Sequence, residues 1–186
     1  AAEYKDNETG LHVIRMSHFS HVLGIAAGLN EAEADDLLHA APMHDVGKIG
    51  IPDRILQKPG PLDPDEWKIM QSHVTIGAEI IGEHASGMLA LARNIALTHH
   101  EKYDGSGYPN GLAGEAIPLV GRIVAIADVF DALTSVRPYK KAWTEDDAIA
   151  FLHDQKGRHF DPQLVDLFTT RLPAIREIRT RWAEKP

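Results

Sequence analysis

The chain has 186 residues, of which 44% are hydrophobic, and a formal net charge of −8. This length and composition fit one compact domain with its own core, whereas the negative charge argues against a protein that coats nucleic acid polymers or anionic membranes. Cysteine is absent, which excludes disulfides, thiolate nucleophiles and thiolate ligands, so a metal site would have to use nitrogen and oxygen donors.

The sequence contains no apolar run of the roughly 18 residues that a membrane helix needs, and no signal-like segment follows its first residue. We therefore expect a cytoplasmic protein without a membrane segment in this stretch. Because the chain opens at Ala1 without a methionine, we expect residues 1–7 to be the end of an upstream linker helix in a longer protein.

Apolar residues at helical spacing predict a first helix over residues 8–29, with Asn7 available as its cap. Asn30 can cap a second helix over residues 31–50. The acidic first turn of this second helix suits the helix dipole, and Pro42 should bend or restart it.

Four prolines between residues 51 and 67 predict a loop with one short helical turn. Helix resumes at Asp65, and glycine or proline signals separate the later helices, which we expect at residues 65–84, 87–100, 119–135, 145–156 and 162–171. No stretch shows sustained two-residue alternation bounded by turns. The sequence therefore predicts an all-α fold, a helical bundle that forms a single domain over residues 1–186.

Eight acidic and histidine side chains stand out because they fall on five separate helical segments; they are Glu8, His12, His44, Asp45, His73, His99, His100 and Asp128. Residues four apart, such as Glu8 and His12, lie one turn above the other on a helix and can reach one centre. Adjacent residues diverge by about 100° on a helix. Asp45 could then bridge two metals while His44 binds one, and the adjacent histidines at 99 and 100 could serve two neighbouring ions.

Each of these residues alone has an ordinary structural explanation. A single buried histidine such as His73 is more often hydrogen-bonded to a carbonyl than bound to a metal. Glu8 could be an acid favoured by a helix dipole, and Asp128 could be a core acid paired with an arginine. The joint pattern favours metal binding, because even a mononuclear site needs three or four such ligands and this bundle offers eight candidates.

Four motifs carry a resemblance to a known family: "HDVGKIGIP" at 44–52, "HH" at 99–100, "DGSGYPNGL" at 104–112 and "RPYKKAW" at 137–143. Together they resemble the HD-GYP family of cyclic-di-GMP phosphodiesterases, within the HD metallohydrolase superfamily, over a match from about Glu8 to about Val165. The resemblance implies an HD-type helical bundle that hydrolyses cyclic-di-GMP to pGpG or GMP.

The resemblance also implies a ligand set. It assigns a metal pair to His44, Asp45, His73, His99, His100 and Asp128, and it implies that Glu8 and His12 complete a third metal position in some members. Two or three divalent metal ions are therefore expected, with iron first and manganese second. Mixed imidazole and carboxylate ligation without sulfur by itself admits iron, manganese, cobalt, nickel or zinc.

A metal cluster suits phosphodiester hydrolysis because it lowers the pKa of bound water, neutralises phosphate charge and aligns the attacking and leaving oxygens. We expect a metal-bridging hydroxide as the nucleophile, with Asp45 holding the metals. Lys48 lies four residues after His44 and could offer a charge to the scissile phosphate or assist the leaving oxygen. Its alternative is an exposed lysine at a helix end.

A doubly negative substrate needs positive charge in this acidic chain, and Arg137 and Lys140 supply it shortly after Asp128. The resemblance implies that Arg137 and Lys140 bind substrate phosphate and that Tyr108 and Asp131 contact the nucleotide. Without it, "RPYKK" would be interpreted as a solvated turn. The glycines at 105 and 107 permit positive φ and a close backbone approach in the loop that contains the tyrosine.

Two alternatives stay open. Within the enzyme class, the substrate could be another cyclic dinucleotide or a nucleotide. From another class, the chain could be a non-catalytic cyclic-dinucleotide sensor or interaction module with a structural metal cluster. The resemblance further implies an upstream receiver or sensory domain and a diguanylate cyclase (GGDEF) domain that docks on the loop with the tyrosine, and a homodimer is compatible with the sequence.

Overall fold

The computed structural model describes residues 9–137 and 140–185 of the chain. Over these ranges the chain is helical, and β-structure is limited to isolated bridges. The elements follow the order α1 (Gly10–Ala26), α2 (Glu31–Ala40), η1 (Ala41–Met43), η2 (Val46–Gly50), α3 (Asp53–Leu56), α4 (Pro64–Gln71), α5 (His73–Ile81), α6 (Gly87–Thr98), η3 (Gly114–Ala116), α7 (Leu119–Thr134), α8 (Glu145–Asp154), α9 (Pro162–Thr170) and α10 (Leu172–Arg181), where η marks a 3₁₀ helix. The predicted all-α class is confirmed.

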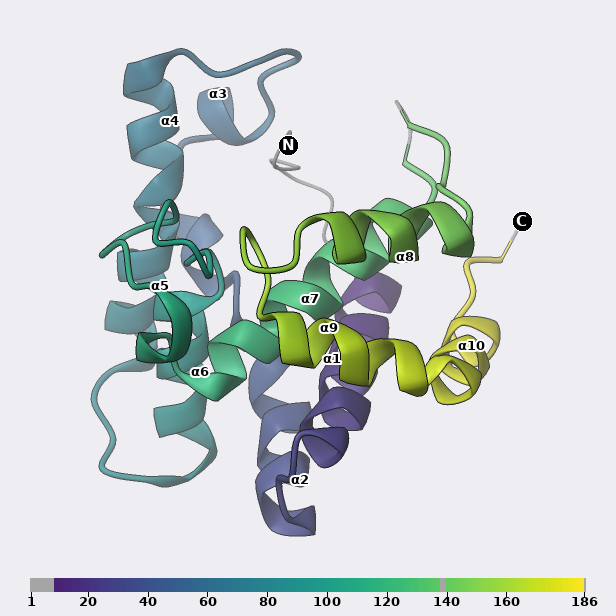
Figure 1. Ribbon diagram of the computed structural model, residues 1–186. Coiled ribbons are helices and arrows are strands. Elements are labelled where there is room, and N and C mark those ends of the chain that lie inside the picture. Colours follow the sequence, from purple (N-terminus) through teal and green to yellow (C-terminus); the bar gives the residue numbers. More distant parts are fainter. Residues whose placement is uncertain (1–8, 138–139, 186) are drawn as a thin grey trace.

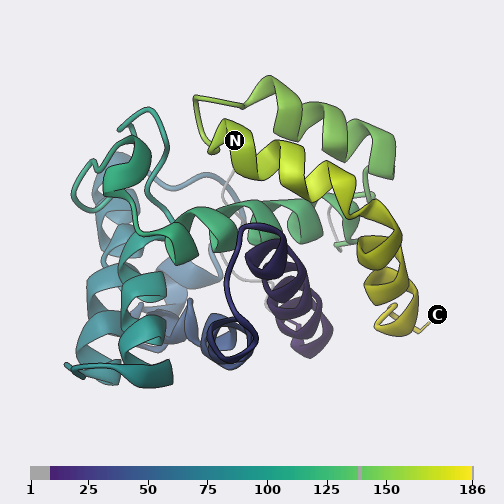
Figure 2. The same ribbon diagram turned by 60° about the horizontal axis from the view of Figure 1, so that its bottom comes forward.

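Helix α7 runs through the middle of the bundle, with α8 and α9 on one side and α1 and α2 on the other (Figures 1 and 2). Its apolar face is buried against α1 and α9. The rings of Phe19, Phe130 and Phe168 are fully buried, and the centroid of Phe130 lies 5.5 Å from that of Phe19 and 5.0 Å from that of Phe168. These three aromatic side chains join α1, α7 and α9 into one core.

Helices α3 and α4 project from the bundle beside α5 (Figure 1) and have a small core of their own. Ile51, Ile55 and Met70 are buried there, and Trp67 packs against them. The prolines of residues 51–67 break the chain into the single short helix α3 and a loop, as the sequence predicts. Asp63 and Glu66 then form a capping box at the start of α4.

Several predicted boundaries were wrong. The helix predicted over residues 31–50 ends at Ala40, and the chain continues as two short 3₁₀ helices, so the predicted restart at Pro42 is confirmed. The helix predicted over residues 65–84 is two helices, α4 and α5. The chain breaks between them at Ser72, whose hydroxyl donates to the carbonyl of Ile69 in the last turn of α4.

Both ends of the chain also differ from the prediction. Helix α1 begins at Gly10 and is capped by Thr9, which accepts from the backbone N–H of His12, rather than by Asn7. Helix α10 was not predicted; it buries Ile175 against the main core. None of the helices in the described ranges combines the length and the apolar character needed to span a bilayer.

Candidate metal centre

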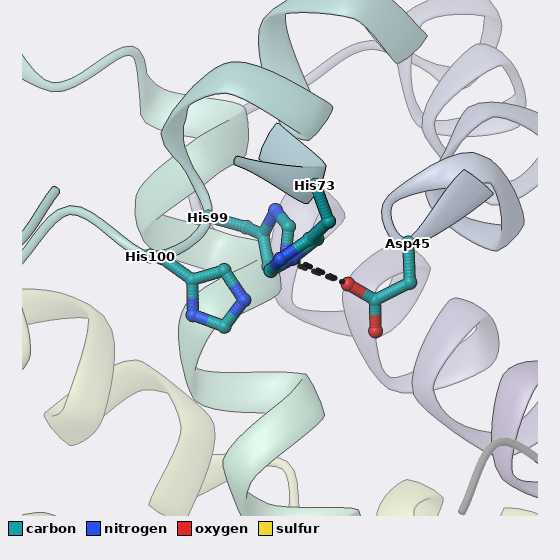
Figure 3. Close-up of side chains that lie close together, drawn as sticks. All are labelled: Asp45, His73, His99 and His100. Carbon is teal, nitrogen blue, oxygen red and sulfur yellow. Dashed lines mark ion pairs between the residues drawn. The ribbon is translucent and has the colours of Figure 1, made fainter. Parts of the chain in front are cut away.

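The structure brings seven of the eight predicted metal ligands together in two adjoining groups. The donor atoms within each group lie within 4.8 Å of one another; the first group is Asp45, His73, His99 and His100, and the second is His12, His44 and Asp128. These residues come from α1, the η1–η2 junction, α5, the end of α6 and α7, which are far apart in the sequence. Figure 3 shows the side chains of the first group facing one another.

Glu8 lies outside the described residues. Its predicted pairing with His12 assumed that both residues occupy one helix. Within the described residues, α1 begins at Gly10, with Thr9 as its N-cap. The placement of Glu8 at a third metal position stays a prediction.

Three buried histidines are oriented in the same way, by a hydrogen bond from the ring Nδ1 to a backbone carbonyl. The bonds run from His44 to Ala41 (2.9 Å), from His73 to Met70 (2.7 Å) and from His99 to Ile95 (2.9 Å). A carbonyl oxygen can only accept, so Nδ1 carries the proton and Nε2 presents a lone pair when the ring is neutral. The fold therefore directs three Nε2 atoms toward one region, where each can bind a metal when its ring is neutral.

Asp45 lies between the two groups. Its Oδ1 is 3.1 Å from Nε2 of His73 and 3.3 Å from Nε2 of His99, whereas its Oδ2 is 3.2 Å from Nε2 of His44. A carboxylate with its two oxygens directed at two neighbouring sets of donors has the arrangement that bridges two cations. The bridging role of Asp45 stays a prediction.

The buried atoms of the first group fit a metal rather than a hydrogen-bond network. Oδ1 of Asp45 and Nε2 of His73 and His99 are buried, yet none of them makes a hydrogen bond of acceptable geometry. Buried polar groups are almost always satisfied, so several unsatisfied acceptors at one point need an explanation. A divalent cation would accept all of these lone pairs at once, which makes this donor set suitable for a metal.

The protonation states in the first group also fit metal binding. Burial alone would raise the pKa of Asp45, but His44 and Lys48 outweigh it and hold that pKa well below its usual range. Burial and the neighbouring His100 lower the pKa of His99 to about 4. The His99 ring is thus neutral at physiological pH and faces an ionised carboxylate, as metal ligation requires.

In the second group, the neighbouring carboxylates affect the histidine pKa more strongly than burial does. Burial lowers the pKa of His44, but Asp45 and Asp128 outweigh it and raise this pKa well above its usual value. The pKa of Asp128 is held well below its usual range because His44 and His12 outweigh its burial. Without a cation, a proton on His44 takes over the neutralisation of the two carboxylates. A metal at this position would replace that proton.

The adjacent residues His99 and His100 follow the last turn of α6. Donor atoms of both belong to the first group, and the ring of His99 also lies 5.1 Å from that of His44 in the second group, so the predicted division between two neighbouring ions stays a prediction. His99 is the C-cap of α6 and His100 lies in the turn that follows, so the regular divergence of neighbours on a helix does not apply. Their ring centroids lie 4.0 Å apart at an angle of 46°.

Lys48 lies on η2, and its Nζ is 3.2 Å from Oδ2 of Asp45. The position of η2 depends on Gly47, because a Cβ at that residue would come within 1.8 Å of the carbonyl oxygen of His73. The glycine in "HDVGK" therefore lets the backbone of η2 approach α5 closely enough for Asp45 and His73 to meet. This places the Lys48 ammonium beside the ligand groups, consistent with its predicted role.

Tyr108 stacks on His100, with ring centroids 4.9 Å apart and an interplanar angle of 14°. Trp67 meets Tyr108 edge to face at 6.0 Å and connects it to the small core of α3 and α4. Buried Glu101 accepts hydrogen bonds from the backbone N–H groups of Gly111 and Leu112 and so closes the loop that carries the tyrosine. The sequence singled out neither Trp67 nor Glu101, because each is an isolated residue without a motif.

The two glycines of this loop are required for different structural reasons. Gly105 has a φ of +86°, as the sequence predicts. Gly107 does not have a positive φ; it is required because a Cβ there would lie 2.4 Å from the backbone nitrogen of Lys102.

The residues predicted to contact substrate lie in different surroundings. Asp131 is buried, and its oxygens meet Arg15 and His12, so its placement argues against direct contact with a substrate. The ammonium of Lys140 donates to the carbonyls of Ala132 and Leu133 at the end of α7, and burial and Arg137 lower its pKa. This argues against a phosphate contact for Lys140. Arg137 is buried beside it, and residues 138 and 139 of the same motif lie outside the described residues.

The model of the HD domain family matches residues 2–164. The chain belongs to the HD domain family. This HD domain is 53% identical to the 3'3'-cGAMP-specific phosphodiesterase 2 of Vibrio cholerae, over 90% of this chain and 32% of that protein. It is 53% identical to the cyclic di-GMP phosphodiesterase response regulator RpfG of Xanthomonas campestris, over 89% of this chain and 44% of that protein.

A third relative of this HD domain is the cyclic di-GMP phosphodiesterase of Thermotoga maritima, 44% identical over 97% of this chain and 49% of that protein. The chain thus spans less than half the length of these curated relatives. The crystal structure of a cyclic GMP-AMP phosphodiesterase of V. cholerae, V-cGAP3, has the same fold, with a TM-score of 0.67 at 20% identity over 94% of this chain and 46% of that chain. The HD-GYP protein Bd1817 of Bdellovibrio bacteriovorus has the same fold, with a TM-score of 0.65 at 22% identity over 87% of this chain and 51% of that chain. The family model and the curated relatives confirm the predicted resemblance to cyclic-di-GMP phosphodiesterases with an HD domain.

Proposed function

We propose that this HD domain is a metal-dependent phosphodiesterase that hydrolyses cyclic-di-GMP to pGpG or GMP. The observation that carries the proposal is the position of Asp45, whose two oxygens face two adjoining sets of imidazole donors. Relatives 44–53% identical to the chain, named cyclic di-GMP phosphodiesterases, support the substrate class. Metal ions bound in the two groups would supply Lewis acidity toward water and phosphate.

The residues of this chain have separate roles in the proposal. Asp45 holds the two groups together, and the Nδ1 bonds of the buried histidines keep Nε2 directed inward. Lys48, beside Asp45, is proposed to stabilise charge on the scissile phosphate or to protonate the leaving oxygen. Arg137 is proposed to bind the second phosphate through its planar guanidinium, and Tyr108 to contact a base.

Iron is the proposed metal and manganese the second choice. The donor set of imidazoles and carboxylates without sulfur supports metals of this group but does not separate them. Elemental analysis of protein never exposed to chelator would identify the metal. Two ions per chain are expected from the two groups, and a third would support the predicted position of Glu8.

A second candidate substrate is 3'3'-cGAMP, because one relative that is 53% identical carries that specificity in its name. The test is turnover of cyclic-di-GMP and 3'3'-cGAMP by the same anaerobically metal-loaded preparation, with products separated by chromatography. We expect a higher kcat/KM for cyclic-di-GMP. Binding of the dinucleotide without turnover, with iron and with manganese, would support the sensor alternative instead.

The remaining partners stay predictions. An upstream receiver or sensory domain agrees with the fact that one relative is a response regulator of which this chain covers 44%. A diguanylate cyclase (GGDEF) domain docking on the loop with Tyr108, a homodimer and a cytoplasmic location are predicted from the sequence and its resemblance. Analytical ultracentrifugation would test the homodimer.

A further inference from the structure

Arg15 forms a buried ion pair behind the second ligand group. The side chain lies on α1 with 5% of the residue exposed, and its Nε and Nη2 donate to the two oxygens of Asp131 at 2.6 and 3.1 Å. Asp131 itself is 1% exposed. Such a two-point fork fixes the plane of a carboxylate as well as its position.

The carboxylate held by Arg15 is in turn bonded to a predicted metal ligand. Oδ2 of Asp131 lies 2.7 Å from Nδ1 of His12, and Nε2 on the other side of this ring lies 3.0 Å from Oδ1 of Asp128. The other buried histidines are oriented by backbone carbonyls, which the helices keep in place. The orientation of His12 instead depends on the Asp131 side chain, which must itself be fixed by other residues.

The remaining donors of Arg15 tie this pair to two other parts of the fold. Nη2 also donates to the hydroxyl of Ser135 just after α7, at 3.1 Å, and Nη1 donates to the backbone carbonyl of Trp182 at 2.8 Å. Trp182 is the C-cap of α10, and its indole stacks on His18 of α1 with centroids 5.9 Å apart. Arg15 is therefore fixed by α1, α7 and α10 together.

We infer that Arg15 is a positioning residue of the metal centre, which fixes Asp131 so that Asp131 orients His12 toward the second ligand group. The inference rests on the metal-centre part of the proposed function. Partners one shell away from a metal typically change its affinity by about 10–100-fold when they are replaced. The alternative is that the pair only holds α1 to α7, as a buried ion pair elsewhere in the fold would.

Arg122 and Asp161 provide the matched control. Nη1 of Arg122 donates to Oδ2 of Asp161 at 2.7 Å, and Asp161 is buried and caps α9. This pair likewise joins two segments of the chain. Nε of Arg122 donates to the carbonyl of Ile117, and Asp161 accepts from the backbone N–H of Gln163 in α9, so these bonds do not involve a predicted ligand. Replacing Arg122 therefore reports the cost of losing a largely buried Arg–Asp pair in itself, since 14% of the Arg122 side chain is exposed.

The experiment is calorimetric titration of chelator-treated full chain with Mn²⁺, together with the thermal midpoint of each metal-free variant. Arg15→Lys keeps the charge without the fork, and Arg15→Met removes both. We expect both variants to lose about 10–100-fold in Mn²⁺ affinity at one site while the other site stays within about twofold of the parent protein. Arg122→Lys and Arg122→Met should lower the thermal midpoint comparably and leave both sites intact.

Wild-type affinity at both sites in Arg15→Lys would overturn the inference, and this variant decides the matter if Arg15→Met does not fold. Asp131→Asn should produce the same single-site loss; unchanged binding there would show that Arg15 does not act through Asp131, which also overturns it. The proposed hydrolysis is judged separately on the parent protein. A parent that binds Mn²⁺ without cleaving a cyclic dinucleotide would refute the activity and leave the positioning role standing.

Discussion

Oδ1 of Asp45 lies 3.1 Å from Nε2 of His73, and both atoms are buried without a hydrogen bond of acceptable geometry. Since Nδ1 of His73 donates to a carbonyl, Nε2 is the ring nitrogen that faces the carboxylate across that distance. A bound metal cation would satisfy the carboxylate oxygen and this nitrogen together. The geometry of this contact therefore fits a metal site.

The first prediction concerns the ligand shared by the two groups. Asp45→Asn keeps the shape of the side chain but removes its charge, so we expect loss of most of the bound metal. Turnover of cyclic-di-GMP should fall by more than about 100-fold, because replacing a residue that only supports a metal ligand already costs about 10–100-fold. Glu8→Ala is expected to lose at most one metal per chain. Elemental analysis and product chromatography measure both effects, and equal metal losses in the two variants would contradict this scheme.

The second prediction separates Lys48 from metal binding. Lys48→Met removes the ammonium 3.2 Å from Asp45 while keeping the length of the side chain. We expect unchanged metal content and a fall in kcat of about 100-fold, the usual scale for a group that stabilises charge or transfers a proton in the transition state. Steady-state kinetics on metal-quantified protein provide the test. Undiminished turnover would exclude Lys48 from the reaction.

The third prediction follows from the close approach of η2 to α5. In Gly47→Ala the new methyl group would overlap the carbonyl of His73, so η2 and α5 have to separate and carry Asp45 away from its partners. We expect a loss of about 3 kcal/mol of unfolding free energy, as for severe overpacking, together with reduced metal content. Gly10→Ala is the control, because nothing lies within 4 Å of a Cβ there. Equal stability of the two variants in urea would show that the overlap is relieved without cost.

The fold class and most helices were predictable because they depend on local periodicity and on proline and glycine signals. Helix ends that depend on hydrogen bonds from side chains to the backbone could not be predicted. Ser72 ends α4 through the carbonyl of Ile69, which has no counterpart in apolar spacing. Helix α10 was missed although Ile175 marks its buried face, because its start directly after α9 leaves no loop to signal a new element.

The candidate ligand residues could be chosen from the sequence because histidines and carboxylates with family spacing are rare together. The residues that support them could not be chosen in this way, since a contact such as the edge-to-face packing of Trp67 against Tyr108 depends on the tertiary fold alone. The same reason explains why the surroundings of Asp131 and Lys140 could not be predicted. Sequence identifies them as polar groups near a site, whereas only the fold shows that Arg15 and the carbonyls at the end of α7 already engage them.

The fourth prediction tests the stack between Tyr108 and His100. Tyr108→Ala removes the ring that packs on a predicted ligand, so we expect about fivefold weaker Mn²⁺ binding at one site, the scale of an aromatic pair of roughly 1 kcal/mol. Tyr108→Phe keeps the ring and should retain the metal. An increase in KM in Tyr108→Phe would then report a substrate contact of the hydroxyl. Loss of metal from both variants would contradict the stacking role.

The fifth prediction concerns the pH dependence of the metal-free protein. Burial lowers the pKa of His99 from 6.5 to about 4, so between these values the unfolded chain binds a proton that the folded chain does not. The contribution of His99 to stability is therefore present above about pH 6.5 and is lost as the pH falls toward 4. From about pH 6.5 to 5 the expected loss is about 1.5 kcal/mol, taking 1.36 kcal/mol per pKa unit.

His99→Gln isolates this effect, because the raised pKa of His44 works in the opposite direction in both proteins. Urea unfolding of chelator-treated protein at pH 6.5 and pH 5 should show a smaller decrease in His99→Gln than in the parent protein. Replacing the exposed His39 by glutamine should leave the decrease unchanged. If the parent and His99→Gln lose the same free energy, the imidazole is solvated rather than held neutral, and its lone pair is not reserved for a metal.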